Sequence, residues 1–242
     1  MRESNLSEVV DLTQRYLSQL KELGEEEIFL NRDLIASLSH LRPESASDLS
    51  KFYRQIKDCQ LCPLGRTRTN LVFGVGNPAA GMVLVGEAPG RDEDLQGEPF
   101  VGRAGQLLTR ILKAIDFERA DVYICNILKC RPPGNRDPLP DEIEACKPYL
   151  LRQLEMIKPR VILVLGRVAA QVLLKTSSDL GKLRGRVHLF GNSKLVVTYH
   201  PAALLRNPRL KRPAWEDVQL ARRVCDGLEP EGANDEEISL FR

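Results

Sequence analysis

Residues 82–90 read MVLVGEAPG, an apolar run that ends in a turn. Three similar runs, each rich in valine, isoleucine or leucine and bounded by turn-forming residues, lie further along the chain, at 122–127, 161–165 and 195–199. Strands that are buried on both faces of a sheet have this composition. Helical patterns alternate with these runs, most clearly at 104–115 and also at 141–157 and 168–174. The alternation predicts an α/β fold whose central, mostly parallel four-stranded sheet is flanked by helices.

The composition is that of a globular chain whose charge is unevenly divided. Of the 242 residues, 43% are hydrophobic and 28% are charged, which excludes the disordered and low-complexity classes. The net charge of +2 hides a basic middle, because residues 51–223 carry 29 Lys and Arg against 17 Asp and Glu. We therefore expect an acidic extension, helical or flexible, at 1–50, a main domain at 51–224 and an acidic tail at 225–242. A basic middle suggests a polyanion-binding domain, although a solvated basic surface has the same balance.

The sequence has neither a membrane span nor a leader pattern. Its apolar runs stay well short of the roughly 20 residues needed to cross a bilayer. Its first residues lack a basic region followed by an apolar one. We therefore expect a cytoplasmic protein with no membrane partner.

Four of the six cysteines have the spacing of a metal site. Cys59 and Cys62 form a C-x-x-C turn, and Cys130 and Cys146, 16 positions apart, each lie beside a proline-containing loop. Four thiolates suit either a zinc ion or an iron–sulfur cluster. The remaining two cysteines, one inside an apolar run and one in the acidic tail, are expected to stay unligated.

Polar side chains stand at the ends of the expected strands, and the third strand is followed by Gly166 and Arg167. Glu87 comes directly after the first strand, Asn126 ends the second, and His200 follows the fourth. Ligands of open parallel sheets bind in the crevice at the carboxyl ends of the strands. We therefore expect these three residues to converge on one cleft, although more than a hundred positions separate the first from the last.

Four motifs in this order carry a resemblance to a known enzyme family. They are GEAPGRDED at 86–94, GEPFVGRAG at 97–105, NILKCRPPGNR at 126–136 and HP at 200–201. Together they resemble the family 4 uracil-DNA glycosylases, over about residues 52–224. The resemblance implies a monofunctional base-excision enzyme that flips uracil out of DNA and excises it, leaving an abasic site. It also implies a [4Fe–4S] cluster held by Cys59, Cys62, Cys130 and Cys146.

The resemblance also implies which residues bind uracil. The Asn126 amide can donate to uracil O4 and accept from N3–H, a pattern that cytosine reverses. Phe100 resembles the family's base-stacking residue. Ala88 and Glu93, both within the first motif, complete the expected uracil-binding set with Glu87 and His200.

The expected chemistry depends on the leaving group. Negative charge grows on uracil O2 as the glycosidic bond breaks, and His200 is the expected catalytic donor to that atom, assisted by backbone N–H groups near Glu87 and Ala88. Glu87 could position water, stabilise the positive sugar or order the loop, and Asn135 is a second candidate for holding the water. Another family carries Asp where Ala88 stands, so leaving-group stabilisation has to contribute more of the catalysis here.

An apolar tip among cations is expected to hold DNA. Leu204 or Leu205 would wedge into the gap left by the flipped nucleotide, while Arg206 and Arg209 bind phosphates. A solvated basic loop is the alternative for this segment. For the whole chain, the alternative function is a non-catalytic, metal-stapled nucleic-acid-binding module, and the three polar residues at the strand ends argue against it.

The acidic tail ends in an apolar run that the enzyme resemblance does not cover. Residues 237–241 read EISLF and look like the short peptide by which bacterial DNA-replication and repair proteins bind the sliding clamp, with Glu where Gln is usual. Apolar side chains at a polar chain end often dock on a partner. We expect a monomer that binds uracil-containing DNA and, through this run, the clamp on the nucleoid; packing of the run on the enzyme itself is the alternative.

Overall fold

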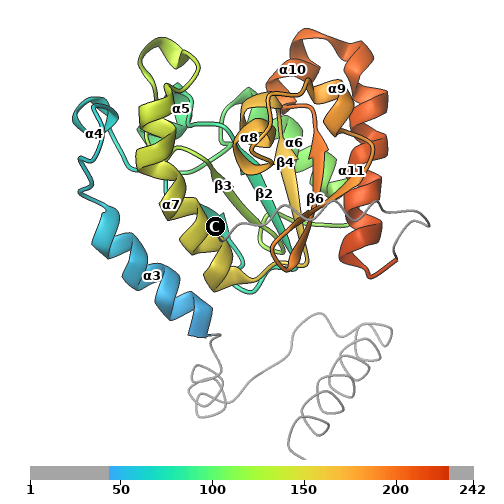
Figure 1. The fold of residues 1–242 in the computed structure, drawn as a ribbon, viewed down its shortest axis with the longest axis horizontal. Helices are drawn as coiled ribbons and strands as arrows, with labels where there is room; N and C mark the ends of the chain where they lie inside the picture. Colours follow the sequence, from blue (N-terminus) through green and yellow to red (C-terminus); the bar gives the residue numbers. More distant parts are fainter. Residues whose placement is uncertain (1–43, 229–242) are drawn as a thin grey trace, which may run out of the picture. The chain divides into compact units, whose positions relative to one another are not determined.

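A six-stranded mixed sheet forms the centre of the computed structural model, which describes residues 44–228 (Figure 1). The strands are β1 (Val75–Gly76), β2 (Met82–Gly86), β3 (Tyr123–Asn126), β4 (Val161–Leu165), β5 (Val187–Phe190) and β6 (Ser193–Thr198). They lie in the order β1-β3-β2-β4-β6-β5. The four central strands are parallel, and β1 and β5 are antiparallel edges. The expected parallel four-stranded core is confirmed, and two edge strands widen it.

Helices connect the strands and cover both faces of the sheet. They are α3 (Glu44–Ile56), α4 (Leu64–Thr67), α5 (Arg91–Gln96), α6 (Arg103–Lys113), α7 (Pro140–Ile157), α8 (Arg167–Leu173), α9 (Leu180–Leu183), α10 (Pro201–Arg206) and α11 (Lys211–Cys225), with short 3-10 turns η1 (Pro133–Asn135) and η2 (Pro208–Leu210). The three helices expected from the sequence correspond to α6, α7 and α8, with shifts of one or two residues at most ends.

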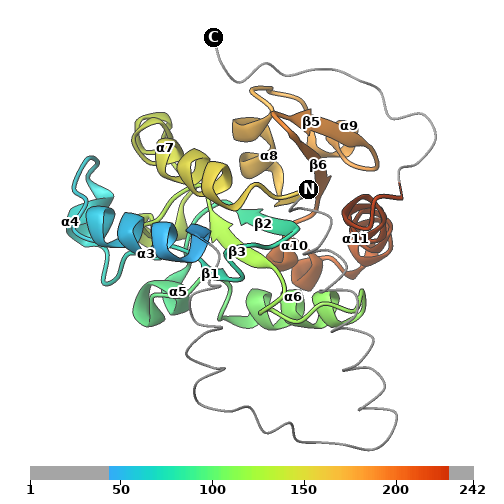
Figure 2. The ribbon, with the colours of Figure 1, turned by 90° about the horizontal axis from the view of Figure 1, so that it is seen from below.

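Alternate strand residues build two separate cores. Val83 and Val85 of β2 join the core covered by α3, α7 and α8, whereas Met82 and Leu84 join the core covered by α6 and α11 (Figure 2). Successive side chains of a strand point to opposite faces, so a strand buried on both sides must be apolar throughout. Every residue of β2 is buried, which explains the uninterrupted apolar run in the sequence.

Several expectations lie outside the described residues. They concern most of the acidic extension and the end of the tail, including the apolar run at 237–241. The division into three parts stays a prediction, and α3 runs across the boundary expected after residue 50. Within residues 44–228, no helix is both long and apolar enough to cross a membrane.

Candidate active site

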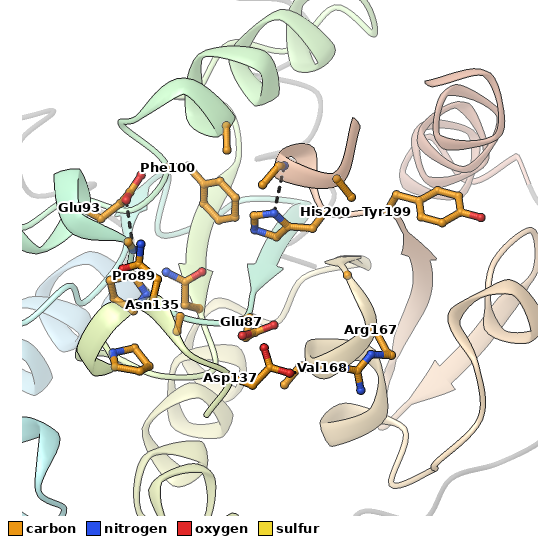
Figure 3. Close-up of a pocket in the computed structure, with 18 of the residues that line it drawn as sticks. Glu87, Pro89, Glu93, Phe100, Asn135, Asp137, Arg167, Val168, Tyr199 and His200 are labelled. Carbon is orange, nitrogen blue, oxygen red and sulfur yellow. Dashed lines mark hydrogen bonds and ion pairs between the residues drawn. The ribbon is translucent and has the colours of Figure 1, made fainter. Parts of the chain in front are cut away.

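The carboxyl ends of the parallel strands open into one pocket of about 510 Å³ (Figure 3). Glu87 enters it from the turn after β2, Asn126 from the end of β3 and His200 from the end of β6. The structure thus brings together the three residues that we expected to meet at the carboxyl ends of the parallel strands. The other expected residues that line the pocket are Ala88, Glu93, Phe100, Asn135 and Arg206.

Asn126 presents an unsatisfied amide in this pocket. Its side chain is 2% exposed, and its Oδ1 atom has no hydrogen-bond partner among the described residues. A buried polar atom without a partner costs about 1–3 kcal/mol, so such an atom in a pocket points to a ligand that supplies the missing hydrogen bond. Gly86 lies opposite in the sheet register, and a Cβ atom there would come within 2.3 Å of Oδ1. Close packing therefore fixes where the amide lies.

Phe100 is held beside His200 in an unusual backbone conformation. Its φ is 55°, in the left-handed region that bulky residues avoid, and the two ring centroids are 5.5 Å apart. The Arg119 guanidinium donates to the carbonyls of Pro99 at 2.8 Å and Phe100 at 3.2 Å. Conformations of this kind persist only where the surroundings impose them, and they concentrate at functional sites.

Glu93 ties two loops of the pocket together. Its carboxylate accepts the backbone N–H groups of Gly90 at 3.1 Å and of Val101 and Gly102, both at 3.0 Å. Gly90 belongs to the turn after β2, and the other two follow Phe100. Although Glu93 lines the pocket, as expected for a uracil-binding residue, these bonds give it the geometry of a group that fixes the loops.

The ring of His200 has one nitrogen, Nε2, that can donate a hydrogen bond in the neutral form. Its Nδ1 accepts the backbone N–H of Ala202 at 3.1 Å at the start of α10, so the proton of a neutral ring lies on Nε2. Burial lowers the pKa of His200 to about 4, with Arg206 acting in the same direction and Glu93 opposing it. The ring is therefore neutral at physiological pH and offers Nε2–H as a donor.

We expect the His200 ring to stay neutral, with its proton on Nε2, from about pH 8 down to about pH 5, since its folded pKa lies below the ordinary value. Nitrogen-15 NMR of histidine-labelled protein measures both the tautomer and the titration. Assignment by the variant His200→Gln identifies the signal among the three histidines. A His200 signal that titrates near pH 6.5 would contradict this assignment.

Glu87 shares its side of the pocket with a charged pair that the sequence reasoning did not select. The pKa of Glu87 is raised by burial and by Asp137, and Arg167 opposes the shift. Arg167 forms an ion pair with Asp137 at 3.2 Å, and all three side chains lie around one part of the pocket (Figure 3). Arg167 lies two residues after the end of β4, so its place at a strand end is visible in the sequence. The position of Asp137, in contrast, depends on how the loop before α7 folds.

The loop that carries Asn135 and Asp137 is anchored at both ends. Asn135 adopts φ 55°, and its Oδ1 accepts the Arg131 Nε–H at 2.7 Å. Arg136 binds both carboxylate oxygens of Glu142, whose side chain is 1% exposed, at 2.9 and 2.6 Å. Bidentate pairs of this kind fix geometry as well as charge. The water-holding role expected of Asn135 stays a prediction.

The expected DNA wedge needs one correction. Leu204 is 2% exposed and packs with Leu107 of α6 and Ala214 of α11, so it belongs to a small core and cannot enter DNA. Adjacent residues of a helix point in different directions, and Leu205 is accordingly 38% exposed. Arg206 lines the pocket and Arg209 is exposed. Leu205 remains as the apolar tip.

The four predicted ligand cysteines surround a second, small cavity, lined by Cys59, Cys62, Cys130 and Cys146. Three donors reach their sulfurs at 3.2 Å: the Arg68 guanidinium, the Lys129 backbone N–H and the Tyr149 hydroxyl. Burial raises the pKa of the Cys146 thiol to about 11. Burial also raises the pKa of the Cys130 thiol, which the Arg68 guanidinium opposes. Thiols that line one cavity and receive hydrogen bonds suit a thiolate-bound metal group.

The four cysteines leave two kinds of metal site open, a zinc ion and an iron–sulfur cluster. Among residues 44–228, no three His, Cys, Asp or Glu side chains come together closely enough to hold one metal ion. In a four-iron cluster each thiolate binds a different iron atom, so the four sulfurs surround the group instead of meeting at a point.

Comparison with known proteins gives consistent matches. The family model described as the uracil DNA glycosylase superfamily matches residues 73–220. A type-4 uracil-DNA glycosylase of Archaeoglobus fulgidus is 48% identical over 190 residues, which cover 75% of this chain and 96% of that protein. A type-4 uracil-DNA glycosylase of Thermotoga maritima is 46% identical, covering 69% and 90%. A type-5 uracil-DNA glycosylase of Thermus thermophilus is 28% identical, covering 75% and 100%.

Proposed function

The chain belongs to the uracil-DNA glycosylase superfamily, and we infer from its relatives and its pocket that it is a type-4 uracil-DNA glycosylase. It acts as a hydrolase on the N-glycosyl bond of deoxyuridine in DNA, flipping the nucleotide out and releasing uracil in base-excision repair. A non-catalytic binding module is not favoured, because the relatives of this chain are named as glycosylases.

The observation that carries this function is the buried Oδ1 of Asn126, which has no hydrogen-bond partner among the described residues. Uracil presents an acceptor at O4 beside a donor at N3–H, which an asparagine amide complements with its own donor and acceptor. Cytosine presents the reverse pattern, so the same amide leaves two groups unpaired against it. Phe100, held beside the pocket, would stack on the flipped base.

His200 supports departure of the base. As the glycosidic bond lengthens, negative charge collects on uracil O2, and a preorganised neutral donor stabilises that charge. The Nε2–H of His200 is such a donor, because Nδ1 is already engaged by Ala202. The sugar becomes positive in the same step, and the Glu87 carboxylate, which shares the pocket, would stabilise it or orient the attacking water with Asn135.

Release of free uracil tests the function. The purified full-length protein is incubated with oligonucleotides that contain a single uracil, hypoxanthine or thymine mismatch, and free base and abasic sites are both measured. We expect uracil release with an intact backbone until alkali is added. Binding of the oligonucleotide without release would support the binding module instead.

We propose that the four-cysteine cavity holds a [4Fe–4S] cluster with a structural role. The cavity joins the chain around Cys59 to the segment after β3 and to α7, which carries Cys146. When bound, the cluster would supply covalent links among these segments and leave the excision chemistry to the pocket.

Cys130→Ser is expected to remove most of the iron and the visible absorption of the protein, and to lower its melting temperature. Cys125→Ser is the matched control, because Cys125 lies in β3 and is buried away from the four-cysteine cavity. Iron analysis, absorption spectra and thermal melts make the comparison. Unchanged iron content in Cys130→Ser would contradict the ligand assignment.

We propose that Leu205, Arg206 and Arg209 form the DNA contact. Leu205 would fill the gap left by the flipped nucleotide, and the arginines would bind adjacent phosphates. Binding to uracil-containing DNA requires no membrane and no second subunit, so a cytoplasmic monomer is the proposed state.

We also propose that residues 237–241 bind the bacterial sliding clamp. Deletion of residues 237–242 is expected to abolish retention on immobilised clamp and to leave uracil release from free oligonucleotides unchanged, since the pocket is built from residues 87–206. A pull-down with purified clamp compares the two forms. Equal retention of both would refute the proposed contact.

A further inference from the structure

Lys129 is a buried charge that the proposed chemistry does not use. Its side chain is 1% exposed, and burial lowers its pKa. Its Nζ donates to the backbone carbonyl of Asn126 at 2.8 Å and to Oε1 of Gln153 at 2.6 Å, both neutral oxygens. Burying an ammonium group is costly, and its hydrogen bonds have to compensate. The function of the buried Lys129 side chain therefore depends on the two groups that it binds.

The two bonds join the strand that carries Asn126 to the helix that carries Cys146. Gln153 lies in α7 with its side chain fully buried, and its Nε2 donates to the Phe73 carbonyl at 3.0 Å and to the Tyr123 hydroxyl at 3.1 Å. Tyr123 begins β3 and Asn126 ends it. The Lys129–Gln153 pair therefore connects α7 to both ends of β3.

The carbonyl of Asn126 lies where the regular strand ends. The paired register of β2 and β3 ends at Gly86 and Asn126. The backbone N–H groups of Ile127 and Leu128 still donate to the carbonyls of Gly86 at 2.9 Å and Glu87 at 3.0 Å before the chain reaches Cys130. The peptide group after Asn126 is therefore held at both ends, at its N–H by the Gly86 carbonyl and at its carbonyl by the Lys129 amine. Because the same residue carries the amide of the pocket, the orientation of its backbone sets the direction of its side chain.

We propose that Lys129 is a positioning residue that holds the Asn126 amide in the orientation that reads the uracil edge. The inference rests on the proposed role of Asn126. The buried contact between Lys129 and the end of β3 would thus serve base recognition. The backbone N–H of Lys129 separately donates to Cys146 Sγ, so loss of its side chain alone leaves that contact in place.

The test is a double-mutant cycle of Lys129→Met with Asn126→Ala. Methionine keeps the length and removes the donor, which leaves the Asn126 carbonyl and Gln153 Oε1 without this partner. We expect Lys129→Met alone to slow single-turnover uracil excision about 10-fold or more, but to change the rate less than about 3-fold in the Asn126→Ala background. Inhibition by free uracil is expected to weaken in Lys129→Met in parallel with its loss of excision rate.

Iron content, visible absorption and melting temperature separate positioning from general damage. We expect Lys129→Met to keep its iron, since the backbone contact to Cys146 remains. Lys113→Met, at a site where the lysine is 59% exposed and pairs with Glu118 on the surface, is the matched control and is expected to retain wild-type rates. If Lys129→Met does not fold, the pair Lys129→Met with Gln153→Leu, which makes both partners apolar, enters the same cycle.

Wild-type uracil kinetics in Lys129→Met would overturn the inference. So would equal fold-losses in the wild-type and Asn126→Ala backgrounds, or a loss of rate that follows a loss of iron. If the wild-type protein itself released no uracil, the proposed function would fail instead, so the two failures are distinguishable.

Discussion

Asn126→Asp is expected to slow single-turnover excision of uracil by about 1,000-fold or more. Sites that read a polar edge by hydrogen bonds reject a mismatched partner by about 10⁴–10⁵. An aspartate in the ionised form has no donor for uracil O4 and brings a negative charge against that oxygen. The side chain is almost fully buried, so water cannot screen this repulsion.

The same substitution tests discrimination as well as rate. Burial favours the neutral form of a carboxyl group, and the protonated carboxyl of the Asn126→Asp variant could present its donor and acceptor differently. Excision from oligonucleotides with a single uracil or a single cytosine measures both outcomes. Asn192→Asp is the matched control, because Asn192 is exposed in the turn between β5 and β6. Near-normal uracil excision by Asn126→Asp would remove the basis for the proposed reading of the base.

His200→Ala is expected to slow the chemical step by about 100- to 1,000-fold, the usual cost of losing one donor to a developing anion. Binding of uracil-containing DNA is expected to change by less than about 3-fold, because the donor is needed chiefly in the transition state. Single-turnover rates and fluorescence anisotropy measure the two quantities.

The matched control for His200 is His188→Ala. His188 lies in β5, and its Nε2 contacts the Leu183 carbonyl at 2.7 Å, so it has no place in the pocket. We expect this control to excise uracil at nearly the wild-type rate. Equal losses of rate and affinity in His200→Ala would instead indicate that the residue only supports the loop before α10.

The parallel core and the pocket follow from local sequence signals. An apolar run buried on both faces is visible without a structure, and the strand-end rule then places Glu87, Asn126 and His200 together. The edge strands were missed because β1 has only two residues and the middle of β5 is half-buried, so neither produces a continuous apolar run.

Other features depend on packing that no local pattern records. The choice between Leu204 and Leu205 depends on which side of α10 meets α6, and both residues look alike in the sequence. Asp137 reaches the pocket through a folded loop. Lysine is usually a surface residue, and only the position of α7 shows that Lys129 is buried.

Gly86, which packs against two residues of the pocket, has consequences for engineering. A methyl group at this position would approach Asn126 Oδ1 within 2.3 Å and the Phe100 ring within 2.6 Å, displacing both. No side chain can be trimmed there to deepen the cavity for a larger damaged base. A redesign of substrate range therefore has to change side chains that line the pocket, such as Ala88.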